Sequence, residues 1–165
     1  MKKKIIFIFL IYLFSSISLN AEQKIAYIDI DFLFSNSAKG KKIIKSLNEI
    51  SKNNFDEISK NEKKITTLSN EINLKKNILS KEEIQIMADN LNQLISDIRQ
   101  NKETLLTNFE AKKKQEIQFF FNDIKPIIDD YMEKKLITVI FDKKNIFIAN
   151  QNHDITQDIL KLIGN

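Results

Sequence analysis

The chain has 165 residues, about one domain, with 26 Lys and Arg against 22 Asp and Glu, a net charge of +4. It has no cysteine and one histidine, which excludes disulfides and zinc sites built from cysteine or from several histidines. Two glycines and one proline provide little turn punctuation. The composition therefore predicts a few long elements, without disulfides or zinc sites of these types.

The first 21 residues, MKKKIIFIFLIYLFSSISLNA, have the layout of a secretory signal peptide. The apolar run from Ile5 to Phe14 is short for a membrane span, so we expect cleavage after Ala21. An uncleaved membrane anchor is the alternative. Without this leader, 23 basic residues face 22 acidic ones. The basic character is mostly targeting sequence, and the remaining charges indicate solvated helix faces rather than a nucleic-acid surface.

Residues 24–34, KIAYIDIDFLF, alternate in polarity with a period of two. Ala26, Ile28 and Ile30 fall on one face, whereas Ile25 and Tyr27 fall on the other. Such a β-branched, alternating run predicts a strand. Its last residues also fit a turn or the start of the next helix.

Residues 36–135 are predicted to be helical because apolar side chains recur at coiled-coil spacing. In the first half the stripe repeats every seven residues, at Ile58, Ile65, Ile72 and Leu79. In the second half it steps by three and four, at Ile84, Met87, Leu91, Leu94 and Ile98. Ser80 and Glu83 match a capping box, which starts a new helix. We predict an antiparallel hairpin with its turn near residues 77–80; a continuous rod is the alternative.

The predicted seam between the two helices is imperfect. With the turn near residues 77–80, Leu105 is expected opposite the level of Asn54 and Phe55, and each helix reaches about 60 Å. Polar side chains stand at or near seam positions, namely Asn54, Asn61, Lys75, Asn101 and Asn108. Such residues lower stability and loosen packing. A role in flexibility and a role in setting the register fit this pattern equally well.

Three consecutive phenylalanines, Phe119, Phe120 and Phe121, lie in the second half of the helical region. Successive residues at about 100° spread the rings over roughly 200° of the helix, more than one partner helix covers. We expect Phe120 to continue the seam and the other two rings to face the body or a cavity at the root of the hairpin. Cover by the short C-terminal helix fits equally well. Pro126 predicts a kink nearby.

The C-terminal region, residues 136–165, is predicted to hold two strands and a short helix. Residues 136–141 are apolar on both faces, and the sequence DKKN then leads to a second apolar run at residues 146–149. This pattern indicates a β-hairpin. Asp154 and Gln157 match a capping box that would open the final helix.

A body of three short strands and one helix is near the lower size limit for independent stability. The second strand has apolar side chains on both faces, and these side chains and the sheet edges would aggregate unless other protein atoms cover them. Self-association is the economical answer. We therefore predict an α+β fold: a long antiparallel α-helical hairpin, or coiled-coil arm, at residues 36–135 projects from a self-associating β-strand body at residues 22–35 and 136–165.

No catalytic or cofactor-binding constellation is recognisable, so we expect no enzyme activity and no cofactor. His153 is more typical of a loop or cap residue than of a metal ligand. Carboxylate pairs such as Asp29 and Asp31 are common on exposed surfaces. The run KKKQ at residues 112–115 is most simply a solvated helix face, with anionic lipid or nucleic acid as the alternative partner.

The whole architecture resembles the Skp/OmpH family of periplasmic chaperones. The resemblance is most specific at the two ends of the mature chain. These are KIAYIDIDFLFSNSAKGKK at the start and ITVIFDKKNIFIANQNHDITQDILKLI at the close. The helical middle carries little information, because any coiled coil would match it.

The resemblance implies a homotrimer in the periplasm, whose helical hairpins hold unfolded outer-membrane β-barrel proteins without ATP until membrane insertion. Carried over by position, the body and trimer strands would contain Ile25, Tyr27, Ile28, Ile30, Leu136, Ile137, Val139, Ile140, Phe141, Ile146 and Ile148. The hairpin tip would carry Lys75, Lys76 and Lys81. Lipopolysaccharide or the membrane surface is a further candidate partner, although the negative charges of Glu82 and Glu83 offset the positive charges at the tip.

Two other classes of function compete with this interpretation. A structural coiled-coil protein of the envelope, or an efflux-adaptor-like hairpin, would also contain a long helical pair. Adaptors set their hairpin within β-rich domains with many turns, and this chain has too few glycines for them. A nucleic-acid binder is disfavoured by the export signal and by the nearly balanced charge of the mature chain.

Overall fold

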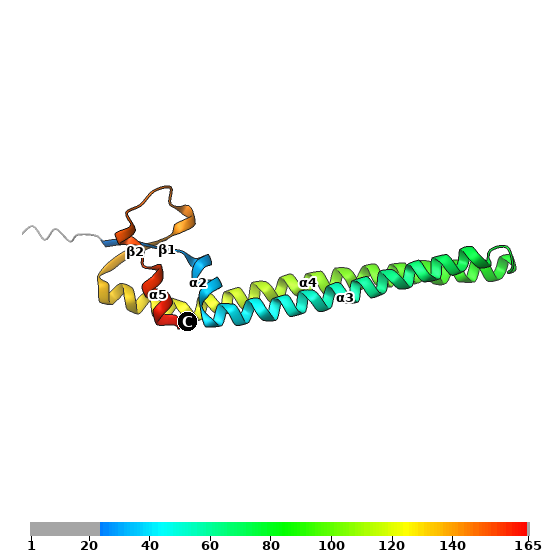
Figure 1. Ribbon diagram of the computed structural model, residues 1–165, viewed down its shortest axis with the longest axis horizontal. Coiled ribbons are helices and arrows are strands. Elements are labelled where there is room, and N and C mark those ends of the chain that lie inside the picture. The colour runs from blue at the N-terminus through cyan, green and yellow to red at the C-terminus, as the bar shows by residue number, and fades with distance from the viewer. Residues whose placement is uncertain (1–23, 165) are drawn as a thin grey trace, which may run out of the picture.

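The computed structural model describes residues 24–164, so the predicted signal peptide lies outside the described residues. The chain folds into a small body from which a long pair of helices projects (Figure 1). Within residues 24–164, no helix has the combination of length and apolarity that a membrane crossing requires.

The body begins with strand β1 (Lys24–Ile28), which is followed at once by helix α2 (Ile30–Asn36). The Asp29 side chain accepts a hydrogen bond from Phe32 N at 2.9 Å and so caps the helix. The strand therefore ends at Ile28, and the alternative in which the last residues of this stretch begin the next helix is confirmed. In particular, Ile30 opens a helix and is not a strand residue.

A sharp junction joins α2 to the first long helix, α3 (Ala38–Lys75). Ser37 is almost fully buried and caps α3 by accepting a hydrogen bond from Gly40 N at 3.1 Å. A Cβ atom at Gly40 would overlap the backbone carbonyl of Phe34. Glycine at this position therefore permits the close approach of the two helices.

The second long helix, α4 (Lys81–Lys135), runs back along α3 toward the body (Figure 1). Its predicted capping box is confirmed: Glu83 N donates to Ser80 Oγ at 3.2 Å, and Ser80 N donates to Glu83 Oε2 at 2.9 Å. Hydrogen bonds from Ser80 lower the pKa of the Glu83 carboxyl. Across the pair, Asn54 Nδ2 donates to the Leu105 carbonyl at 3.3 Å, which puts these residues at one level.

The end of α4 belongs to the body rather than to the projecting pair. The helix continues through Pro126 to Lys135, and Phe120 and Ile124 are buried in the core. Ile43 of α3 is buried in the same core. We therefore use "the arm" for residues 44–119, which lie between Ile43 and Phe120, and "the body" for the other described residues.

The sheet of the body has two parallel strands, β1 and β2 (Ile137–Asp142). Ile25 pairs with Val139 and Tyr27 with Phe141, and the register shifts between Lys24 and Ile25. The opposite edge of β1 is partly covered, because Ile155 N donates to the Tyr27 carbonyl at 3.0 Å. Within residues 24–164, the outer edge of β2 has no strand partner.

Two predictions for the C-terminal region were wrong. Leu136 is not in the strand: it ends α4 in a left-handed conformation, with φ of 58°. The predicted hairpin to residues 146–149 does not form, because a 3-10 helix at Lys143–Asn145 follows β2 directly. Asp142 caps that turn by accepting from Lys144 N at 3.2 Å. DKKN has no glycine for the tight turn that a two-residue β-hairpin favours.

The chain closes with helix α5 (Thr156–Ile163), which packs on α2 and α4. Asp154 accepts from Thr156 N at 2.9 Å, but its own N–H donates to Gln151, so the predicted reciprocal box with Gln157 is absent. One buried apolar cluster joins β1 and the four helices, and Ile137 and Ile140 of β2 pack against it. The cluster comprises Ala26, Ile28, Leu33, Ile43, Phe120, Ile124, Ile155, Ile159 and Leu160.

Candidate functional site

The face of the sheet that turns away from the core carries exposed apolar side chains. Ala26 and Ile28 point into the core, whereas their neighbour Ile25 and the β2 residues Val139 and Phe141 are exposed. Phe141 is 48% exposed although it is a large aromatic residue in a strand. An exposed apolar strand next to an open sheet edge favours association with another chain.

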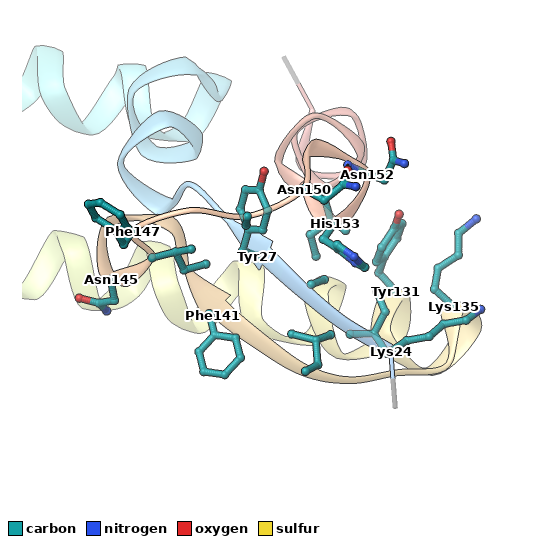
Figure 2. Close-up of a pocket in the computed structure, with 16 residues that line it drawn as sticks. Lys24, Tyr27, Tyr131, Lys135, Phe141, Asn145, Phe147, Asn150, Asn152 and His153 are labelled. Atoms are coloured by element: carbon teal, nitrogen blue, oxygen red, sulfur yellow. The ribbon is translucent and has the colours of Figure 1, made fainter. Parts of the chain in front are cut away.

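A hollow of about 1040 Å³ lies on this face of the sheet, between the strands, the end of α4 and residues 145–153. Figure 2 shows Tyr27 and Phe141 from the strands, Tyr131 from α4 and Phe147 from the following loop around it. Lys24 and Lys135 stand at one end. The wall is mostly apolar, and no constellation of acid, base and nucleophile converges in it.

The loop after β2 exposes its apolar residues almost completely. Phe147 is 103% exposed and Ile148 is 85% exposed, whereas Ile146 is half-buried. Residues 146–149 have no strand conformation, so the predicted strand residues Ile146 and Ile148 are not brought to the sheet. Leaving two large apolar side chains in water is unfavourable, at roughly 1.5–3 kcal/mol for each when compared with burial. The loop is therefore a candidate contact surface.

Ion pairs hold this loop against the first strand. Lys143 Nζ lies 3.7 Å from Asp29 Oδ2 and 3.5 Å from Asp154 Oδ2. Burial would raise the pKa of the Asp154 carboxyl, but hydrogen bonds with Thr156 and the charge of Lys143 hold it below its usual range. A hydrogen bond from Lys144 likewise lowers the pKa of Asp142. The exposed apolar loop thus has anchored ends.

Tyr131 connects α4 to α5 beside the hollow. Its hydroxyl donates to Asp158 Oδ2 at 2.7 Å. Burial, the hydrogen bond and the nearby carboxylate raise the pKa of Tyr131 to about 12. Tyr131 therefore remains neutral and acts as a donor that ties the two helices together.

The three phenylalanines at the end of the arm have three different environments. Phe120 is fully buried and meets Phe34 of α2 edge to face, with ring centroids 5.0 Å apart. Phe121 is half-buried and packs against the core. Phe119 is 48% exposed. One ring thus anchors the arm in the body, and a neighbouring ring remains available for contact.

Within residues 44–119, no side chain is buried. Seam residues such as Leu105 and Phe109 are only half-buried. Several large apolar side chains outside the seam are exposed, namely Phe55, Leu74, Ile78, Ile86 and Leu106. Phe55 and Leu74 are 19 residues apart on α3, and Ile86 and Leu106 are 20 residues apart on α4, so these groups are spread over about 30 Å. The arm therefore offers many separate apolar contacts and no single pocket.

The tip combines exposed apolar groups with charges that are partly neutralised. Leu74 and Ile78 are among the most exposed apolar side chains of the arm. Lys75 Nζ lies 2.6 Å from Glu71 Oε1, so one of the three predicted tip lysines is paired within its own helix. Lys76 and Lys81 are close to it in sequence, at the end of α3 and the start of α4.

Residues 24–164 contain no group of three or more His, Cys, Asp or Glu side chains placed to hold a metal ion. His153 is exposed and ends a short 3-10 helix at Gln151–His153, beside the hollow of Figure 2. The carboxylates Asp29 and Asp154 have structural partners, as described above. The side chains of the body described above therefore have structural roles: they cap helices, form ion pairs or pack in the core.

The structure brings some of the predicted residues together and separates others. Ile25, Tyr27, Val139 and Phe141 share one face of the sheet, whereas Ile28 and Ile140 pack on the other. Sequence reasoning missed Tyr131 and Phe147. Tyr131 follows Ile124 and Ile128 at helical spacing. This spacing predicts that the three side chains share the helix face that packs on the body. Phe147 could have been noted only as an aromatic residue within an expected strand.

A model of the family described as outer membrane protein (OmpH-like) matches residues 24–163. Among solved structures, the fold is similar to one described as a candidate outer membrane chaperone (OmpH-like) from Caulobacter crescentus CB15. That similarity has a TM-score of 0.77 at 15% sequence identity, and covers 87% of this chain and 85% of the other. No curated protein matches the chain significantly. At this identity, the structural likeness shows the fold alone.

Proposed function

The chain belongs to the OmpH-like family of outer membrane proteins, and from this premise we propose that it is an ATP-independent holdase chaperone of the periplasm. Its clients are unfolded outer-membrane β-barrel proteins, which it keeps from aggregating before membrane insertion. The observation that carries the proposal is the arm, in which no residue is buried and exposed apolar groups are spread over about 30 Å.

A surface of this kind suits an unfolded chain better than a folded partner. Many weak apolar contacts can be exchanged one by one, so different client sequences fit the same arm. Preferential binding of the unfolded state opposes both aggregation and premature folding by mass action. Location in the periplasm is supported by the family and by the signal-peptide pattern of residues 1–21.

We propose that the working unit is a homotrimer, in which three antiparallel helical hairpins surround a shared cavity. The open edge of β2, with the exposed residues Val139, Phe141, Phe147 and Ile148, supports assembly through the body. Mass measurement at micromolar concentration should give three times the mature mass. The double variant Phe147→Ser/Ile148→Ser should shift the protein toward monomer, whereas Leu106→Ser in the arm should not. A stable monomer of the wild type would contradict the trimer.

The root phenylalanines are proposed to serve assembly or client retention. Phe119 is exposed and Phe121 half-buried where the arm meets the body. Phe119→Ala or Phe121→Ala should weaken trimer assembly or client retention more than Ile72→Ala near the tip. Equal effects of the three substitutions would contradict this role of the root phenylalanines.

The chaperone function is tested by diluting a urea-unfolded outer-membrane barrel protein into buffer and following its light scattering. We expect suppression of scattering at a stoichiometric amount of trimer, with no nucleotide added. Bovine serum albumin at the same mass concentration is the control for unspecific crowding. Full aggregation at that ratio would overturn the proposal. Constitutive co-purification with one membrane complex would instead favour a structural role in the envelope.

A further inference from the structure

Positive charge is concentrated where the arm leaves the body. We call this region the root: residues 38–52 of α3 and 108–122 of α4. It contains eight lysines and three acidic residues. The more distal stretches, residues 53–74 and 82–107, contain five basic and nine acidic residues. A mature chain with almost balanced charge therefore has a strongly basic root.

Three of the root lysines, Lys41, Lys45 and Lys52, form a line on α3 that we call the lysine stripe. At 100° per residue they fall within about 40° of the helix circumference. They lie opposite the seam marked by Asn54, and all three are exposed. A shallow hollow of about 440 Å³ runs along them, with Ile44 among its lining residues. The stripe thus combines ammonium groups with an apolar floor.

The stripe lysines differ in their pairing from three of the other root lysines, Lys39, Lys112 and Lys113. Lys39 pairs with Asp123, and Lys112 Nζ lies 2.7 Å from Glu116 Oε1. By contrast, in the part of the chain that the structure describes, no carboxylate oxygen lies within 4.0 Å of a stripe ammonium group. Glu49 is the one acidic residue that lines the same hollow. The stripe therefore has a net positive charge that is not neutralised within the chain.

From this arrangement we propose that the lysine stripe binds acidic segments of unfolded client proteins, an inference that rests on the chaperone function proposed above. The stripe lysines are about 6 Å and 10 Å apart along the helix axis. In an extended peptide at about 3.3 Å per residue, side chains two and four positions apart share one face, and their separations of about 7 Å and 13 Å are within reach of the flexible lysine side chains. Apolar side chains of the same segment contact Ile44, which lines the hollow. They also contact Phe55, which is 71% exposed and follows Lys52 by three residues.

The test measures binding of two fluorescent peptides to the full-length mature protein by anisotropy. One peptide is extended and carries Glu at the matching spacing between Leu and Phe residues; in the other, every Glu is replaced by Gln. We expect wild type to bind the acidic peptide about tenfold more tightly at low salt, and this preference should vanish near 0.5 M salt because ions screen exposed charges.

The variant Lys41→Gln/Lys45→Gln/Lys52→Gln should lose the preference for the acidic peptide and keep its affinity for the neutral one. The matched control is Lys60→Gln/Lys63→Gln/Lys64→Gln, which removes three exposed lysines from the same helix outside the root. The control should retain the preference. Equal loss in both variants, or no preference in wild type, would overturn the assignment.

Two further readouts separate other occupants from a client segment. If the stripe variant loses binding only to vesicles of anionic phospholipid, the stripe is a membrane contact and the proposal fails. If it loses only a salt-sensitive self-association, the partner is a second copy and the proposal fails. Binding of the neutral peptide without any charge effect would leave the chaperone function intact, whereas binding of neither peptide would count against both.

Discussion

The body and the arm are built from the same kinds of residue but are packed in opposite ways. In the body, two strands and parts of four helices bury one apolar cluster, and Phe120 and Leu33 have no exposed surface. In the arm, two helices run side by side for about 48 Å and bury no residue fully. The same chain thus contains a fixed core and a loosely packed extension.

The difference lies in how many partners each helix has. A helix in the body is covered from several sides, so its apolar stripe is sealed. Each helix of the arm has a single partner, and the seam contains polar groups such as Asn54 and Asn101, which bond to Leu105 and Glu57. Because polar seam residues lower stability, the arm is suited to movement and weak contacts, while the body is suited to assembly.

The largest expected effect comes from emptying the centre of the body. Phe120→Ala should lower the free energy of unfolding by about 3–5 kcal/mol, because it removes a fully buried ring and leaves a cavity. Phe55→Ala, which truncates an exposed ring of the arm, should change it by no more than about 0.5 kcal/mol. Denaturant unfolding measures both, and similar losses would break the contrast between body and arm.

The junction between body and arm should be nearly as sensitive. Gly40→Ala should cost about 1–3 kcal/mol, because the added Cβ overlaps the Phe34 carbonyl and forces α2 and α3 apart. The control is Ser46→Ala, at an exposed position of the same helix. Thermal unfolding compares the two variants. A neutral Gly40→Ala would mean that this close approach is not required.

A smaller, stabilising effect is expected in the arm. Asn54→Leu replaces a polar seam residue by an apolar one and should stabilise the helical pair by about 1 kcal/mol. Amide hydrogen exchange should slow near residues 50–58 and 101–109 and remain unchanged in the body. Faster exchange in the arm would show that Asn54 is needed for the register.

The smallest effect concerns the pH dependence of the body. The pKa of Tyr131 is about 12 in the folded chain, above the ordinary value of 10.0. Its contribution to stability is therefore complete below pH 10 and is lost as the pH rises toward about 12. Tyr131→Phe should cost about 1 kcal/mol at neutral pH and should flatten the fall in stability between these values. An unchanged alkaline slope would contradict this role.

The sequence was most informative where local chemistry decides the structure. Ser80 and Glu83 marked the start of α4 because a capping box needs only four residues. The alternation around Ile28 marked β1, and the resemblance of the two ends to the OmpH family was confirmed by the family match. Helical spacing also predicted that Phe120 continues the seam whereas its two neighbours point elsewhere, and the three rings differ in exposure.

Other features depend on contacts that a pattern does not reveal. Asp29 caps α2, and this local bond overrides the alternation that predicted a longer strand. The run at residues 146–149 has strand-like composition, but a strand needs a neighbour, and the 3-10 turn after Asp142 directs it away from β2. Self-association and client binding depend on the surfaces of other molecules, which no pattern within one chain encodes.

The most direct test of the central claim is hydrogen exchange of the full mature protein with and without an unfolded outer-membrane barrel protein. We expect added protection along the arm, residues 44–119, with the largest gain near Lys45 and Lys52 of the lysine stripe, and little change in the core around Phe120 and Ile159. Protection gained only in the body, with the arm unchanged, would contradict a division in which the body assembles and the arm holds the client.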